Sequence, residues 1–198
     1  MYKKSIILIG AGGHCRSCID VIEQEGSFEI CGVVERPGAV ANRMVSGYPI
    51  IGTDDELANL RKRYSHALVS VGQIKTPNIR ERLFKLLLNY DFTLPVIVSP
   101  LAYVSRTATV GRGSIVMHHA LVNAGAVIGA NCIINSKALI EHDVVIEDNC
   151  HIATGALVNG QAIIKKGTFI GSNTVCFENA VIGPGVIIGA GLRVKRNV

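Results

Sequence analysis

The second half of the chain carries an apolar residue at every sixth position without a break. The series starts at Val98 and ends at Val194, and sixteen of its seventeen members are Val or Ile. Chance does not produce a series of this length and phase. A fixed short period is the signature of a solenoid, in which identical units stack along one axis.

A second series lies two residues before the first and consists mainly of small side chains. Its members are Ala102, Ala108, Ser114, Ala120, Ala126, Cys132, Ala138, Val144, Cys150, Ala156, Ala162, Thr168, Thr174, Ala180, Val186 and Leu192. We interpret each six-residue unit as one short strand and one tight corner, so three units form an eighteen-residue coil of a triangular prism. Stacked coils lie about 4.8 Å apart, and each inward Val or Ile contributes roughly 1.5–3 kcal/mol on burial. The pattern therefore predicts a parallel β-helix.

The first half shows a different pattern, in which strands alternate with helices. Residues 5–9 form an unbroken apolar run, which is typical of a buried parallel strand. A glycine-rich loop at 10–14 follows, then a helix from about residue 15 to 24 and a strand at 29–34. This order is that of a β-α-β unit.

The same alternation continues to the start of the repeat. Thr53 and Glu56 form a capping box for a helix that ends in the basic residues 61–63. Residues 67–71 form another apolar strand. One face of a following amphipathic helix is marked by Ile79, Leu83, Leu86, Leu87 and Tyr90. We predict a small Rossmann-like α/β domain over residues 1–95, followed by a β-helix over residues 96–198.

Composition excludes several classes of function. The formal net charge is +5, but the basic residues are scattered and no aromatic residues lie between them, which argues against nucleic-acid binding. No apolar run is long enough to span a membrane and no signal peptide is visible. We therefore expect a cytoplasmic protein with six reduced cysteines. Cys132 and Cys150 fall in the inward series and are read as core residues, while Cys15 and Cys18 are read as small helix residues.

The loop after the first strand favours a nucleotide site. Gly10-x-Gly12-x-x-Cys15 is one glycine short of the dinucleotide fingerprint, although Glu35 matches its acidic ribose-binding position. Backbone N–H groups at a helix N-terminus bind anionic groups well. The loop therefore indicates a nucleotide or nucleotide-sugar more than NAD.

Three stretches together resemble the sugar acyltransferases of sialic-acid-biosynthesis type, which include acetyltransferases of nucleotide-linked 4-amino sugars. They are residues 9–14 (IGAGGH), residues 70–72 (SVG) with Ile79-Arg80, and residues 134–143 (INSKALIEHD) with His151. The resemblance covers nearly the whole chain in the same order. It implies that the β-helix is left-handed, that the enzyme is a homotrimer, and that acetyl-CoA is the co-substrate.

The resemblance also assigns roles to residues. It implies that His142 is the general base and that Asp143 tunes or orients it. His151 then contacts acetyl-CoA, with Gly160, Ser172 and Ala190 at cofactor-proximal places. Gly12, Gly13, His14 and Gly72 hold the nucleotide-sugar. Glu35-Arg36 stands where the family has paired acidic residues, so Arg36 bears on the base or sugar preference.

The repeat tests the assignment of His142 without the family. His142 lies outside both inward series, so its side chain should point outward. One coil away on either side stand Gly160 and Ala124, which leave a notch around the imidazole. His151 lies elsewhere on the coil, so we expect the two histidines to meet only across a subunit interface.

Other acceptors and another class remain open. The acyl acceptor is the amine of a nucleotide-linked amino sugar or a hydroxyl of a sialic-acid-like sugar. A non-catalytic or metal-binding β-helix is the rival class and needs three histidines converging in a trimer. His118, His142 and His151 lack that spacing, and we expect no metal ion. His66, His118 and His119 receive no role.

Overall fold

A computed structural model describes residues 3–38 and 43–198 of the protein. It separates into two compact units, each described here by itself. The first contains residues 1–72 and 79–95, and the second contains residues 73–78 and 96–198. The short segment 73–78, which the sequence places in the first domain, thus packs with the repeats. No helix in the described ranges is long and apolar enough to cross a membrane.

The first unit is built on a five-stranded sheet of order β3-β4-β2-β1-β5. The strands are β1 (Lys4–Ile9), β2 (Phe28–Glu35), β3 (Met44–Val45), β4 (Tyr48–Thr53) and β5 (His66–Val69). β1 pairs in parallel with both β2 and β5, as the β-α-β pattern predicts. β3 and β4 form an antiparallel pair that the sequence analysis did not predict.

The helices of this unit are α1 (Gly13–Glu25), the short 3-10 helix η1 (Asp54–Glu56), α2 (Leu57–Leu60) and α3 (Asn78–Asn89). The capping interaction is present, because the Thr53 N–H donates to Glu56 Oε2 at 2.8 Å. The helix it starts is shorter than predicted and ends at Leu60, before the basic residues.

The predicted apolar face of α3 is wrong at one position. Ile79 is 54% exposed, whereas Arg80 is 1% exposed. Arg80 is buried in place of Ile79 because its guanidinium donates from Nη1 to Val69 O at 3.0 Å and to Val71 O at 2.6 Å. The arginine thereby satisfies backbone carbonyls at the end of β5 that would otherwise be buried without a donor.

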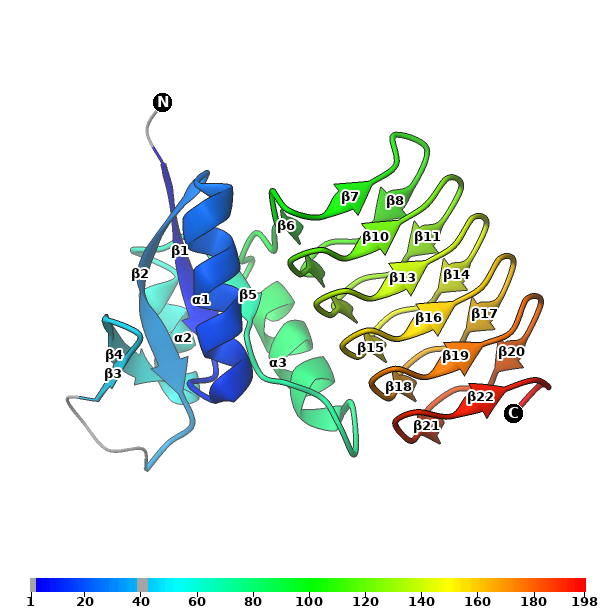
Figure 1. Ribbon diagram of the computed structural model, residues 1–198. Helices are drawn as coiled ribbons and strands as arrows, with labels where there is room; N and C mark the ends of the chain where they lie inside the picture. The colour runs from blue at the N-terminus through cyan, green and yellow to red at the C-terminus, as the bar shows by residue number, and fades with distance from the viewer. Residues whose placement is uncertain (1–2, 39–42) are drawn as a thin grey trace. The chain divides into compact units, whose positions relative to one another are not determined.

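The second unit is a parallel β-helix of three sheets, which we name by a central strand (Figure 1). The β13 sheet contains β7 (Tyr103–Val104), β10 (Leu121–Val122), β13 (Leu139–Ile140), β16 (Leu157–Val158), β19 (Val175–Cys176) and β22 (Arg193–Val194). The β14 sheet contains β8 (Thr109–Val110), β11 (Val127–Ile128), β14 (Val145–Ile146), β17 (Ile163–Ile164) and β20 (Val181–Ile182). The β15 sheet contains β6 (Ile97–Val98), β9 (Ile115–Val116), β12 (Ile133–Ile134), β15 (His151–Ile152), β18 (Phe169–Ile170) and β21 (Ile187–Ile188).

Every strand of the β-helix pairs in parallel with a strand eighteen residues away, for example Ile140 with Val158. The two inward series form one continuous core, in which central members such as Ile140 and Ile152 are fully buried. Cys132 and Cys150 lie in this core, as predicted. Burial raises the pKa of Cys176 to about 11, and Cys15 and Cys18 in α1 are also buried with a raised pKa.

A third series, which the sequence analysis missed, forms the corners. From residue 113 onward, one residue in each six-residue unit has a positive φ between 54° and 73°. Gly and Asn dominate because they adopt this left-handed conformation at least cost. The members are Gly113, His119, Gly125, Asn131, Lys137, Asp143, Asn149, Gly155, Gln161, Gly167, Asn173, Asn179, Gly185 and Gly191. The fold class predicted from sequence, a Rossmann-like domain followed by a left-handed parallel β-helix, is confirmed.

Candidate active site

His142 lies at a corner of the β-helix, between strands β13 and β14. We call this turn, residues 141–143 and their equivalents in neighbouring coils, the His142 corner. The next residue, Asp143, has a φ of 59°, which turns the chain and directs its carboxylate back toward the imidazole. Half of the His142 side-chain surface is exposed, so the ring is accessible from solvent.

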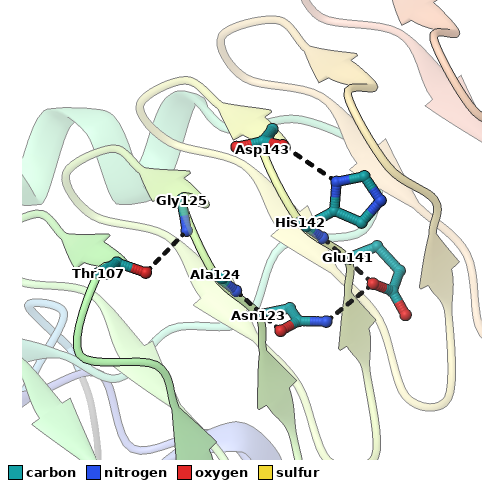
Figure 2. Close-up of polar contacts among 7 residues, drawn as sticks. All are labelled: Thr107, Asn123, Ala124, Gly125, Glu141, His142 and Asp143. Carbon is teal, nitrogen blue, oxygen red and sulfur yellow. Dashed lines mark hydrogen bonds and ion pairs between the residues drawn. The ribbon is translucent and has the colours of Figure 1, made fainter.

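The two ring nitrogens of His142 have different surroundings (Figure 2). Nδ1 lies 3.0 Å from Asp143 Oδ2, and because a carboxylate only accepts, Nδ1 carries the proton. Nε2 is then left with a lone pair in the neutral ring. A Cβ placed on Gly160 would stand only 2.8 Å from Nε2 and from Cε1, so the ring lies directly against this glycine.

Glu141 supports the corner from the other side, and the sequence analysis assigned it no role. Its Oε2 accepts the Asn123 side-chain N–H at 2.9 Å and the His142 backbone N–H at 3.2 Å. Behind Asp143 stands Gly125, where any Cβ would collide with Asp143 Oδ1. Asn123 and Gly125 each precede their partner by eighteen residues, and this spacing was a signal that could have identified them.

Carboxylates set the electrostatics of the imidazole. The hydrogen bond that His142 donates to Asp143 raises the pKa of His142 above its usual value, and the charges of Asp143, Glu141 and Glu178 act in the same direction. A neutral histidine with a raised pKa is a stronger base. The arrangement suits proton abstraction by Nε2 from a group that approaches the exposed corner.

His151 occupies a different environment, on the strand β15. It is 6% exposed, its Nδ1 lies 2.6 Å from Gln73 O, and its Nε2 lies 3.1 Å from Asn135 Nδ2. The ring of Phe169 packs edge-on at 5.2 Å between centroids. His151 is therefore held on the β15 sheet. Within the same chain, it lies away from the His142 corner.

Ser172 and Ala190 lie at a third place, the corner between the β15 and β13 sheets. They follow β18 and β21 in successive coils, and Gly191 N donates to Ser172 O at 2.8 Å. Of the residues predicted to contact acetyl-CoA, Gly160 lies at the His142 corner within one chain, while His151, Ser172 and Ala190 do not.

In the first unit, the residues predicted to hold a nucleotide-sugar lie together. α1 begins at Gly13 with Gly12 as its N-cap, and a Cβ on Gly72 would lie 3.4 Å from the His14 Cβ. Gly12 and Gly13 have open space beside them. These glycines leave backbone N–H groups accessible at a helix N-terminus.

The acidic residue at the end of β2 supports this loop. Glu35 Oε2 accepts the Ala11 N–H at 3.2 Å, and its Oε1 accepts the Arg36 N–H at 2.9 Å. The Arg36 side chain is exposed. Across residues 3–38 and 43–198, no three His, Cys, Asp or Glu side chains of one chain are grouped so as to hold a metal ion.

Comparison with known proteins covers both units. Residues 5–87 match the family model described as the PglD N-terminal domain, and residues 125–160 match the model of the bacterial transferase hexapeptide, six repeats. No curated protein matches the sequence.

Solved structures match almost the full length. The acetyltransferase domain of PglB from Neisseria gonorrhoeae FA1090 is 29% identical with a TM-score of 0.90, over 99% of this chain and 93% of that one. The same domain in complex with acetyl coenzyme A gives a TM-score of 0.87 at 29% identity, over 98% and 93% of the chains. A histidine-to-asparagine mutant of perosamine N-acetyltransferase from Caulobacter crescentus, in complex with CoA and GDP-perosamine, is 26% identical with a TM-score of 0.74, over 98% and 90%.

The fold, the exposed histidine at a β-helix corner and these matches define an enzyme class, the sugar acetyltransferases with hexapeptide repeats. Within that class, the chain is similar to the PglD-like acetyltransferases, in agreement with the family that its motifs resemble.

Proposed function

We propose that this chain transfers the acetyl group of acetyl-CoA to the amine of a nucleotide-linked amino sugar, with His142 as the general base. The observation that carries the proposal is the geometry of the imidazole: Nδ1–H donates to Asp143, Nε2 lies against Gly160, and half of the side-chain surface is exposed. The structural neighbours in complex with acetyl coenzyme A, or with CoA and GDP-perosamine, support both substrates.

The chemistry is a direct transfer. The amine nitrogen attacks the thioester carbonyl carbon, and one N–H proton passes to His142 Nε2 as the C–N bond forms. The tetrahedral oxyanion, held by backbone N–H groups, then collapses and breaks the C–S bond. The proton on His142 moves to the departing CoA sulfur, which returns the histidine to its neutral form. No covalent intermediate with the protein is required.

The remaining predicted residues complete the proposal. Gly12, Gly13, His14 and Gly72 bind the nucleotide-sugar at the N-terminus of α1, with Glu35 and Arg36 beside it. Gly160, His151, Ser172 and Ala190 contact acetyl-CoA. Within a single chain, His151, Ser172 and Ala190 lie away from His142. The complete site therefore takes residues from two subunits.

The surface beside the His142 corner supports an assembly of subunits. The outer face of the β13 sheet carries an apolar side chain in each central coil, and the β14 sheet does the same. Their outward residues are Leu121, Leu139, Leu157 and Val175, and Val127, Val145, Ile163 and Val181. Stripes of this kind are typical of faces that another subunit covers. We propose a homotrimer with its sites at the subunit interfaces. All six cysteines are free thiols, which favours the cytoplasm.

A thiol-release assay tests the reaction. Purified protein is given acetyl-CoA with UDP-, GDP- and dTDP-linked amino sugars and with free sialic acids. We expect CoA thiol to be released with an amino sugar nucleotide. Release with sialic acids alone would replace the proposal by O-acetylation, and no release with any acceptor would overturn it.

A mixing experiment tests the shared site. His142→Ala and Ser172→Trp protomers should each lose most of their activity, and co-refolding them should restore activity if each site combines residues of two subunits. No recovery in a mixed trimer would place the whole site within one chain. Light scattering of the wild type reports whether the assembly is a trimer.

A further inference from the structure

The column of residues stacked on His142 continues to a carboxylate that the proposed mechanism does not use. Gln161 N donates to His142 O at 3.0 Å, and Asn179 N donates to Gly160 O at 3.0 Å. Residues 142, 160 and 178 therefore occupy the same place in three successive coils. Glu178 stands two coils beyond His142, on the side where the imidazole lies against Gly160.

In this column, only Gly160, which has no side chain, lies between the Glu178 carboxylate and the His142 imidazole. The imidazole occupies the space that a Cβ on Gly160 would fill. Glu178 is exposed. After the Asp143 hydrogen bond, the charge of Glu178 is among the influences that raise the pKa of His142, so the two groups are near enough to interact.

In the described part of the chain, no hydrogen bond or ion pair engages the carboxylate of Glu178. Two basic side chains of the next coil pack on the adjacent aromatic ring instead: the Arg193 guanidinium lies 5.8 Å and the Lys195 Nζ 5.9 Å from the Phe177 ring centroid. The column of His142 thus contains a carboxylate that has no ion-pair partner among the described residues.

We propose that Glu178 binds the ammonium group of the acceptor sugar and makes this site select an amine over a hydroxyl. The inference rests on the proposed function, since it names the acceptor of that reaction. A primary amine is protonated at neutral pH, and an approaching ammonium is attracted to an unpaired carboxylate near Nε2. The bound ammonium gives one proton to solvent, and the neutral amine then attacks the thioester as described above.

The alternative acceptors gain nothing from the same charge. A sugar hydroxyl is neutral, so Glu178 gives it no electrostatic advantage over water. A sialic-acid-like sugar carries a carboxylate, which Glu178 and Asp143 repel. The residue therefore decides between the two acceptor classes that the sequence left open.

The test compares Glu178→Gln and Glu178→Asp with the wild type on paired acceptors. Each 4-amino sugar nucleotide of the panel is matched with the nucleotide of the sugar bearing a hydroxyl at the same carbon. We expect Glu178→Gln to lower kcat/KM for the amine by about three- to tenfold, mainly through KM. The KM for acetyl-CoA should not change, Glu178→Asp should retain most of the activity, and added salt should weaken amine use in the wild type more than in the variant.

Glu29→Gln provides a matched control, because it removes an exposed carboxylate of the first unit that enters no step above. Equal kcat/KM for the amine in wild type and Glu178→Gln would overturn the inference while leaving the proposed function intact. If the wild type releases no thiol, the proposed function fails, and calorimetric binding decides the inference separately. Equal affinity of wild type and variant for the 4-amino nucleotides would then overturn it, and weaker binding by the variant alone would support it.

Discussion

Two neighbouring corners of the β-helix use the same backbone turn and differ in how their charges are compensated. At the His142 corner the left-handed residue is Asp143, and at the next corner, which we call the Glu147 corner (residues 147–149), it is Asn149. Each follows a two-residue strand, β13 or β14. The backbone therefore does not distinguish the His142 corner, where we propose catalysis, from the Glu147 corner.

The side-chain columns do distinguish them. At the Glu147 corner, Glu147 accepts Lys165 Nζ at 2.8 Å and the Lys166 backbone N–H at 2.9 Å, so its charge is paired across adjacent coils. At the His142 corner, the next coil contributes Gly160, and the carboxylate of Asp143 acts on a histidine. A solenoid can thus carry different side-chain columns on two corners that share the same backbone turn.

The largest effect should follow removal of the base. His142→Ala is expected to lower the turnover number by about 10²- to 10⁴-fold, the usual contribution of a general base. The side chain is half exposed, so the melting temperature should stay near that of the wild type. Steady-state thiol release with circular dichroism melting measures both quantities. Unchanged turnover in a folded variant would remove His142 from the mechanism.

Filling the notch should produce the next largest effect. Gly160→Ala places a methyl group 2.8 Å from the imidazole and must displace the ring or the glycine backbone. A displacement of about 1 Å can cost as much as 10²-fold in rate, so we expect a loss of roughly ten- to a hundredfold.

The control for this variant is Gly189→Ala, where the added methyl meets only Leu192 Cδ1 at 3.5 Å. Neither glycine has a positive φ, so backbone strain is not a factor in either substitution. The two variants should melt alike if the effect at Gly160 is confined to the site. An equal loss of activity in both would mean that the notch has no special role.

The repeating half of the molecule was largely predictable because its periodicity is local. The inward series places Ile140 and Ile152 in the core, and the eighteen-residue spacing alone puts Gly160 over His142. The same eighteen-residue spacing places Glu178 in the column of His142 and Gly160.

Contacts between distant segments were not predictable. The Gln73 carbonyl lies within hydrogen-bond distance of His151 Nδ1, 78 residues away in the sequence. The Gln73 side-chain N–H donates to Asn149 O at 3.0 Å, 76 residues away. No periodicity encodes such a contact. Arg80 was likewise missed as a core residue, because a guanidinium is buried only where carbonyls such as Val69 O are left to accept from it. The β3–β4 pair was not predicted because β3, at Met44–Val45, is only two residues long and gives no alternating pattern.

The third effect concerns the pH dependence of the base. Asp143 raises the pKa of His142 chiefly through its hydrogen bond, and the reactive form is the neutral ring, present above that pKa. Asp143→Asn should therefore lower the pKa and move the acid limb of the kcat/KM profile to lower pH. Loss of a fixed tautomer should also reduce the plateau several-fold. A profile measured from pH 5 to 9 checks both, and an acid limb that stays in place would assign it to another group.

The smallest effect should come from the Glu147 corner, and it sharpens the contrast between the two turns. Glu147→Gln breaks the Lys165 ion pair but keeps an oxygen to accept the Lys166 N–H. Exposed pairs contribute up to about 1 kcal/mol, so the free energy of unfolding should fall by no more than that. The hydrogen bond from Lys165 holds the pKa of Glu147 below its usual value, so the wild type should lose this stability as the pH falls through that pKa.

Turnover per folded molecule should not change in Glu147→Gln, because the pairing of Glu147 with Lys165 and Lys166 joins two coils and touches no reacting group. Urea denaturation at pH 7 and pH 3.5, with thiol release as the second readout, measures both. A tenfold loss of turnover would show that the two corners are coupled and that the charge pairing of one serves the chemistry of the other.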